Sequence, residues 1–153
     1  MALMKEMQFP VGVRWRGGRL ARVDAREKDP IEVTTPPEFR TGTRGYWTPE
    51  EMLVASAASS FVLTLAALAE RRGIALLDAT VIARGHVGHR NDGTFGFTLV
   101  EVDAQLETVA GSEGDVRRAA ADAEARCLVG HALAVPLAVH ARVAVPQRLA
   151  VAG

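Results

Sequence analysis

The chain is predicted to be an α+β protein with antiparallel sheets, and three patterns in the sequence indicate this class. A stretch without any charged residue runs from residue 52 to 69 and has the length of one long helix. Segments that alternate apolar and polar residues precede and follow it, as expected of strands with one buried face. In order, the predicted elements are βββ-α-ββ-α-β, with antiparallel sheets around central helices.

The N-terminal third is predicted to form three short strands. Residues 11–16 and 19–25 flank Gly17-Gly18, and two glycines favour a two-residue hairpin turn because both tolerate a positive φ. Residues 31–34 form the third strand, which Pro36-Pro37 ends. The loop that follows contains Tyr46 and Trp47.

The first helix has both of its ends marked in the sequence. Thr48 is a suitable N-cap, Pro49 occupies the first helical position, and Glu51 completes a capping box. Arg71, Arg72 and Gly73 form a basic last turn and a stop. The uncharged stretch is long enough to raise the alternative of a membrane span. Its serines and alanines make it weakly hydrophobic, however, so we expect a helix buried in protein and no membrane association.

The C-terminal half is predicted to be a hairpin, a helix and a last strand. Alternation over residues 79–87 and 100–107 predicts two strands joined by a turn at Asn91-Asp92-Gly93. Ser112 begins a second helix with Gly130 as its stop, and residues 137–145 alternate again. The apolar stripe of this helix follows helical spacing: Val116, Ala119, Ala120, Ala123 and Cys127.

Length and composition predict one soluble domain, residues 1–153. Eighteen basic and eighteen acidic residues cancel, so no net charge favours nucleic acid or an anionic membrane. The one cysteine excludes an internal disulfide and gives no support to an oxidising compartment. The first twelve residues lack the apolar region of a signal peptide, so we expect a cytoplasmic location.

Two segments, together with the order of elements, resemble the OsmC/Ohr family of osmotically inducible and organic hydroperoxide resistance proteins. They are the helix start Pro49-Glu50-Glu51 and the stretch from Glu124 to Leu133 around Cys127. The resemblance extends from about Val13 to Val145. It implies a thiol-dependent peroxidase of the stress response, built as an intertwined homodimer. We expect no cofactor.

The resemblance also assigns positions to the family's site. The glutamate falls on Glu50 and the resolving cysteine on Cys127. The arginine falls on Arg19, with Arg16 as the alternative. The position of the peroxidatic cysteine, ten residues beyond the glutamate, falls on Ser60.

A serine at position 60 changes the chemistry that is possible. A thiol is partly ionised at neutral pH and forms a sulfenic acid with a peroxide, whereas a hydroxyl does neither. Cys127 alone cannot complete a two-cysteine cycle within one chain. The sequence therefore predicts a degenerate member of the family, and leaves open a reaction of Cys127 with an external thiol reductant. The alternative is a non-catalytic binder of a small hydrophobic ligand at the dimer interface.

Helix geometry separates Glu50 from Ser60. Ten residues of one helix span about 15 Å, so these side chains could meet only if two copies of the helix cross near Ala55. This favours a homodimer with composite sites. The hydroxyl of Ser60 could instead bond the carbonyl four residues earlier.

The remaining candidate residues concern ligands and metals. Tyr46, Trp47 and Phe61 are candidates for an apolar ligand site, although the first two could instead pack over the helix start. His86 and His89 lie three residues apart on a predicted strand and therefore face opposite sides, so no metal site is expected.

Overall fold

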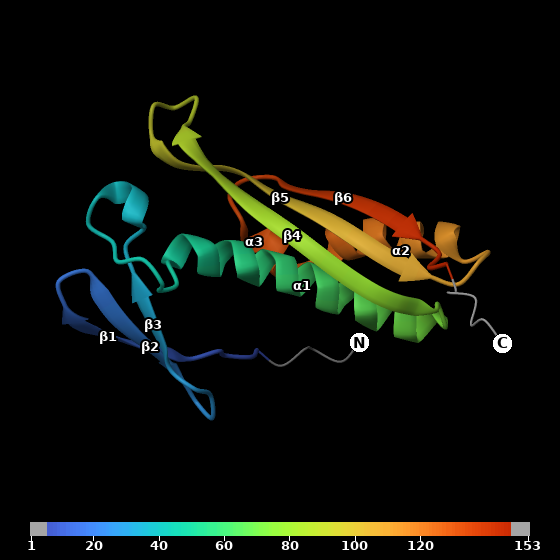
Figure 1. Cartoon of the computed structure of the whole chain (residues 1–153), viewed down its shortest axis with the longest axis horizontal. Helices are drawn as coiled ribbons and strands as arrows, with labels where there is room; N and C mark the ends of the chain where they lie inside the picture. The colour runs from blue at the N-terminus through green and yellow to red at the C-terminus, as the bar shows by residue number, and fades with distance from the viewer. Residues whose placement is uncertain (1–5, 148–153) are drawn as a thin grey trace. The chain divides into compact units, whose positions relative to one another are not determined.

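The computed structural model describes residues 6–147, and its contacts divide the chain into two compact units, Met1–Met52 and Leu53–Gly153. Figure 1 shows the elements in chain order. Residues 1–5 and 148–153 lie outside the described range. They include the start of the segment in which no signal peptide was expected, and both ends of the predicted domain 1–153.

The first unit contains an antiparallel sheet of three strands in the order β1-β2-β3. These strands are β1 (Val11–Gly17), β2 (Leu20–Ala25) and β3 (Ile31–Thr34), as predicted. The turn between β1 and β2 lies one residue later than expected: Gly17 still pairs with Leu20, so the turn residues are Gly18 and Arg19. Arg19 therefore projects from the turn itself.

A short 3₁₀ helix, η1 (Pro37–Phe39), follows β3 and was not predicted. The chain then returns to β3, where the amide of Thr34 donates to the carbonyl of Trp47 at 2.9 Å. The predicted capping box begins α1 (Pro49–Arg72). The amide of Thr48 donates to Glu51 Oε2 at 2.9 Å, and the amide of Glu51 donates to Thr48 Oγ1 at 3.2 Å.

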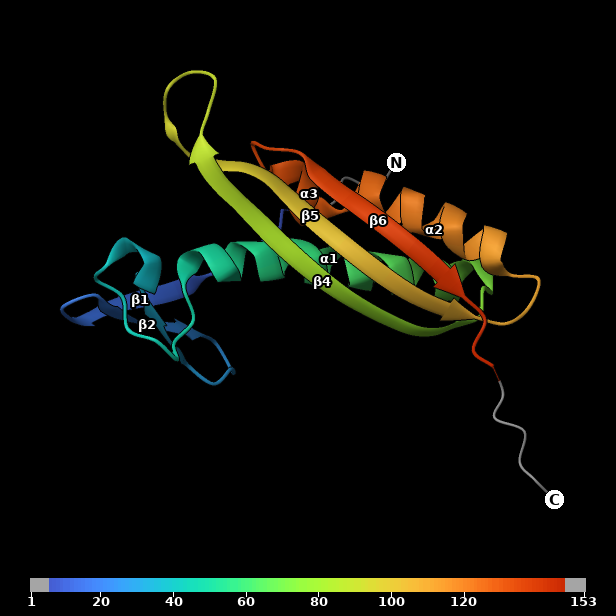
Figure 2. The same ribbon diagram turned by 45° about the horizontal axis from the view of Figure 1, so that its top comes forward.

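The second unit packs helices on one face of a three-stranded sheet (Figure 2). Strands β4 (Leu76–His89) and β5 (Phe95–Thr108) form the predicted long hairpin with its turn at residues 91–93. Strand β6 (Leu137–Ala144) lies on the other side of β5. It pairs parallel to β5, which corrects the prediction of purely antiparallel sheets. The helical connection between β5 and β6 makes this direction possible, because parallel neighbours need a crossover.

The second predicted helix is divided in two. Helix α2 (Glu113–Arg126) ends at Cys127, whose backbone is extended, and a short helix α3 (Leu128–Ala132) begins there. Gly130 is thus inside α3 and is not the stop that the sequence suggested. The N-cap of α3 is Cys127, and its sulfur accepts from the amide of Gly130.

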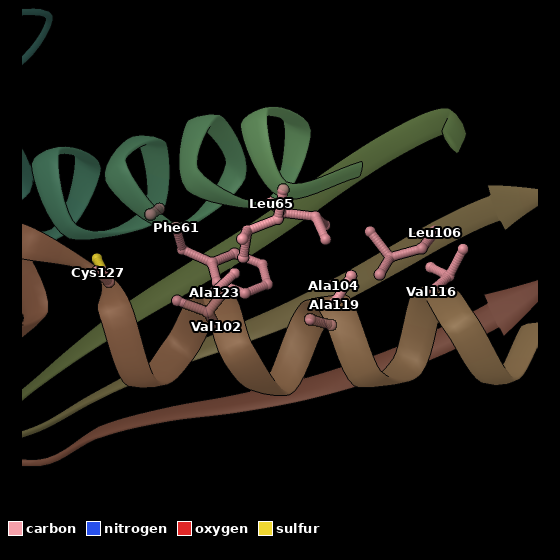
Figure 3. Close-up of a cluster of buried hydrophobic side chains, with 12 residues drawn as sticks. Phe61, Leu65, Val102, Ala104, Leu106, Val116, Ala119, Ala123 and Cys127 are labelled. Atoms are coloured by element: carbon pink, nitrogen blue, oxygen red, sulfur yellow. The ribbon is translucent and has the colours of Figure 1, made fainter. Parts of the chain in front are cut away.

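The core of the second unit lies between α1, α2 and the inner face of β5 (Figure 3). Phe61 and Leu65 of α1 are fully buried there. The predicted stripe of α2 and the alternate residues of β5 complete this core: Val102, Ala104, Leu106, Val116, Ala119, Ala120, Ala123 and Cys127.

Helix α1 is the one helix within residues 6–147 that is long and apolar enough, by length and composition, to cross a membrane. Of the most apolar 18-residue stretch of this helix, 33% is buried inside the protein. A helix that is apolar on all sides can also be buried in protein. One side of such a helix packs on the core of its own chain, and another side can pack on a partner.

Candidate functional site

A thiol and a hydroxyl that are far apart in the sequence meet in the second unit. The sulfur of Cys127 lies 3.2 Å from Oγ of Ser60, although the two residues are 67 positions apart. Ser60 is half-buried in the middle of α1, and Cys127 is fully buried at the junction of α2 and α3. The structure thus brings into contact two residues that the resemblance was expected to assign to one site.

Local structure explains how each group is positioned. The break between α2 and α3 turns the Cys127 side chain toward α1, where its thiol also faces the carbonyl of Ala57 at 3.9 Å. The amide of Gly130 donates to the sulfur at 3.4 Å. These polar neighbours of the thiol are all neutral. None of them is a positive charge or a base that would favour ionisation of the thiol.

The hydroxyls of the neighbouring serines behave differently. Ser59 donates to the carbonyl of Ala55 at 2.7 Å, which is the bond expected of a serine in a helix interior. The recorded contact of the Ser60 hydroxyl is with Cys127 instead. Two adjacent serines therefore have distinct roles, one satisfied by its own helix and one facing the thiol.

A pocket in the first unit brings Arg19 and Glu50 together. Its volume is about 520 Å³. Arg19 comes from the β1–β2 turn and Glu50 from the first turn of α1. Arg16, the alternative arginine, is exposed on β1 and is not part of this lining. The apolar and hydroxyl-bearing members of the lining include Trp15, Leu20, Val33, Thr34, Pro36 and Phe39.

The carboxylate of Glu50 is not engaged by the helix that carries it. The adjacent Glu51 forms the capping box, and this leaves Glu50 free to face the pocket. Its Oε2 is buried and has no hydrogen-bond partner within the described part of the chain. A buried carboxylate oxygen without a donor is costly, so this atom is suited to a donor supplied from outside the unit.

The predicted ligand residues lie elsewhere. Tyr46 and Trp47 are 43% and 52% exposed and do not line the pocket, while Phe61 is fully buried in the core of the second unit. Trp15 and Phe39, which do line it, were not singled out. The aromatic character of Trp15 and Phe39 was the available signal.

The two histidines of the predicted strand, His86 and His89, have different neighbours. Among residues 6–147, no group of three or more histidine, cysteine, aspartate or glutamate side chains is placed to hold a metal ion. His86 faces Glu101, and His89 stacks edge-on against Phe95 with ring centroids 5.4 Å apart.

The chain belongs to the OsmC family, because residues 42–140 match the family model described as OsmC-like protein. No curated protein sequence matches the chain. Solved structures share the predicted fold. An OsmC-like protein of unknown function from Vibrio cholerae has a TM-score of 0.82 at 16% identity, covering 90% of this chain and 100% of that one.

Two organic hydroperoxide resistance proteins are also similar in fold. The protein from Elizabethkingia anophelis has a TM-score of 0.73 at 21% identity, covering 94% of this chain and 100% of its own. The OsmC protein from Legionella pneumophila has a TM-score of 0.68 at 19% identity, covering 90% and 97%. The chain is therefore an α+β protein of the OsmC and organic hydroperoxide resistance family.

Proposed function

We propose that this chain is a degenerate member of the hydroperoxide stress-response family, one that keeps the geometry of the two-cysteine site but lacks the attacking thiol. The observation that carries the proposal is the 3.2 Å contact between Ser60 Oγ and Cys127 Sγ. The partner positions meet, yet one of them bears a hydroxyl. A hydroxyl has no accessible anion at neutral pH and forms no sulfenic acid, so the oxidation of a first thiol and its resolution by a second cannot occur.

The surroundings of Cys127 support the same conclusion. The thiol is fully buried, and its recorded polar neighbours are uncharged. Peroxidatic cysteines are activated by nearby positive charge or by a base, and they need access to solvent. Cys127 in this environment is suited to resolving a sulfenic acid from position 60 and not to attacking a peroxide.

Measurement of organic hydroperoxide consumption tests this proposal. With cumene hydroperoxide and dithiothreitol as the reductant, the wild type is expected to be inactive, whereas Ser60→Cys gains turnover. In that variant the new thiolate takes the terminal oxygen and releases the alcohol. Cys127 then displaces water to form a disulfide, which dithiothreitol reduces. Ser59→Cys is the matched control, because it adds a thiol to the neighbouring residue, whose hydroxyl bonds Ala55 and not Cys127.

The outcomes of this assay are distinct. Wild-type turnover that disappears in Cys127→Ala would establish a reaction of Cys127 with an external reductant and refute the degenerate site. Equal activity of Ser60→Cys and Ser59→Cys would mean that any added thiol suffices and that the contact with Cys127 has no bearing on catalysis.

The pocket of Arg19 and Glu50 supports a second candidate function, the binding of a small apolar molecule. Its volume of about 520 Å³ lies in the range of small-molecule sites. Trp15 and Phe39 supply aromatic surface, and Glu50 Oε2 provides a buried acceptor for a hydroxyl or amine of the ligand.

Binding of 2-phenyl-2-propanol, the unreactive alcohol product of cumene hydroperoxide, tests the second candidate. We expect saturable binding by calorimetry, accompanied by a change in tryptophan fluorescence. Glu50→Gln should weaken it, since the carboxylate is a stronger acceptor than an amide oxygen. Glu51→Gln is the control on the adjacent residue, which belongs to the capping box. Equal losses in the two variants would exclude a specific role of Glu50.

We further propose a homodimer with composite sites. Alternate residues from Met7 to Trp15 are apolar and at least 59% exposed, and Leu63 of α1 is 69% exposed. Apolar rows of this length are typical of surfaces that another chain covers. Glu50 and Ser60 lie ten residues apart on one helix, about 15 Å along its axis. An antiparallel crossing of two α1 helices near Ala55 would place Glu50 of one copy near Ser60 of the other. A monomeric mass by light scattering would refute the dimer.

A further inference from the structure

The pocket of the first unit is lined by two charged side chains that do not neutralise each other. Arg19 is exposed on the β1–β2 turn, and Glu50 is half-buried in the first turn of α1. Within residues 6–147, every recorded ion pair joins other side chains. One oxygen of Glu50, Oε2, is buried without a hydrogen-bond partner in the same range. The pocket therefore contains a guanidinium and a carboxylate, each without a charged partner of its own.

An aromatic side chain is tied to the turn that carries Arg19. The indole nitrogen of Trp15 donates to the carbonyl of Gly18 at 3.0 Å, and Gly18 is the residue before Arg19. The ring of Trp15 is 73% exposed, and it lines the pocket. An apolar group of a ligand can therefore lie on Trp15 while a charged group of the same ligand contacts Arg19.

The second aromatic side chain of the lining, Phe39, belongs to a loop that is fastened to the end of β3. The amide of Thr43 donates to Thr34 Oγ1 at 3.3 Å. The backbone at Gly42 lies so close to Thr35 that a Cβ there would come within 1.7 Å of its carbonyl oxygen, so only glycine fits. Because these contacts hold the loop before a ligand arrives, less entropy is lost on binding.

The chemistry of the two charged groups selects a ligand that carries two opposite charges. A carboxylate accepts hydrogen bonds and pairs with an ammonium group, whereas a guanidinium only donates and pairs with a carboxylate in a bidentate contact. A ligand with an ammonium group alone would be repelled by Arg19, and one with a carboxylate alone would be repelled by Glu50. A ligand with both charges avoids the two penalties, because each of its charges lies on the group of opposite sign.

We propose that this pocket binds the zwitterion of an α-amino acid with an apolar side chain. The ammonium group of the ligand donates to the Glu50 carboxylate, and its carboxylate accepts from Arg19. The apolar side chain packs on Trp15 and Phe39. The pocket volume of about 520 Å³ is in the range of small-molecule sites. This assignment names the ligand class of the second candidate function above and rests on that function.

Calorimetry of the full chain with four probes that share a phenyl ring tests the assignment. L-Phenylalanine carries both charges, phenethylamine only the ammonium group, 3-phenylpropionate only the carboxylate, and 2-phenyl-2-propanol neither. We expect L-phenylalanine to bind about tenfold more tightly than either singly charged probe, since each of these omits one charge-assisted hydrogen bond. Arg19→Gln should remove the advantage over phenethylamine, and Glu50→Gln should remove the advantage over 3-phenylpropionate.

A matched control and the remaining outcomes make the test specific. Arg16→Gln removes a positive charge from β1 outside the lining, so the advantage over phenethylamine should persist. An equal loss in Arg16→Gln and Arg19→Gln would overturn the proposal, and this comparison stands even if Glu50→Gln folds poorly. Binding of 2-phenyl-2-propanol without a preference for L-phenylalanine would also overturn it, while the apolar pocket would remain. Absence of binding by all four probes would refute both the ligand class and the binding function.

Discussion

Replacing Ser60 with cysteine should produce a disulfide with Cys127. In the native chain, Ser60 Oγ lies 3.2 Å from the sulfur of Cys127. A disulfide bond is about 2.05 Å long, so the two side-chain atoms must approach by about 1 Å. The longer carbon–sulfur bond of cysteine covers part of this distance, and a small side-chain rotation on α1 covers the rest.

The expected gain in stability follows from the length of chain that the bond closes. The two positions are 67 residues apart. For a loop of this size, the loss of entropy in the unfolded chain corresponds to about 4 kcal/mol at 25 °C. The free energy of unfolding of a small domain is about 5–15 kcal/mol, so the oxidised variant should unfold at a clearly higher urea concentration than the reduced one.

Thiol counting and urea unfolding of the same sample provide the assay. After mild oxidation with diamide, the denatured Ser60→Cys protein should contain no free thiol, and dithiothreitol should restore two. In Ser59→Cys the thiol replaces a hydroxyl that faces Ala55, so both thiols should remain free. Free thiols in oxidised Ser60→Cys, or equal bridging in the two variants, would refute the contact between α1 and the α2–α3 junction.

Two other predictions concern the core and the surface charges. Phe61→Ala should lower the free energy of unfolding by about 3–5 kcal/mol, because the ring is fully buried between α1, α2 and β5. Phe95→Ala, at a ring that is 59% exposed, should cost only about 0.5 kcal/mol, and urea unfolding that gave similar losses would contradict the assigned core. Arg72→Gln should lower the melting temperature at neutral pH, because the hydrogen bond from Arg72 holds the pKa of Asp122 below its ordinary 3.8. A carboxyl with a depressed pKa stabilises the fold above its unfolded pKa, so this loss should shrink as the pH falls below about 4 and should not grow there.

Local chemistry allowed much of the fold to be predicted. The start of α1 follows from a few adjacent residues, since Thr48 and Glu51 can satisfy each other's amides without any help from the rest of the chain. The inner face of β5 follows from strict alternation, because a strand with one buried face repeats every second residue. Patterns of this kind depend on neighbours in sequence, and the sequence contains them in full.

Contacts between distant segments could be predicted only in part. The resemblance assigned Ser60 and Cys127 to one site, but their contact depends on a helix break at Cys127, where the sequence suggested a continuous helix to Gly130. The choice of Arg19 over Arg16 for the pocket likewise depends on a turn that lies one residue later than expected. Hydrophobic periodicity locates the two strands but leaves open which residues form the turn between them, and Arg19 reaches the pocket from that turn.

The sequence by itself determined the family, the order of the strands and the two longer helices, and the presence of a single cysteine, because these depend on residue identity and local pattern. The tertiary structure decided the parallel direction of β6, the meeting of Ser60 with Cys127, and the pairing of Glu101 with two histidines from other strands. Each of these joins residues that are far apart in the chain. Their proximity is set by the packing of helices on the sheet, and no local propensity encodes it.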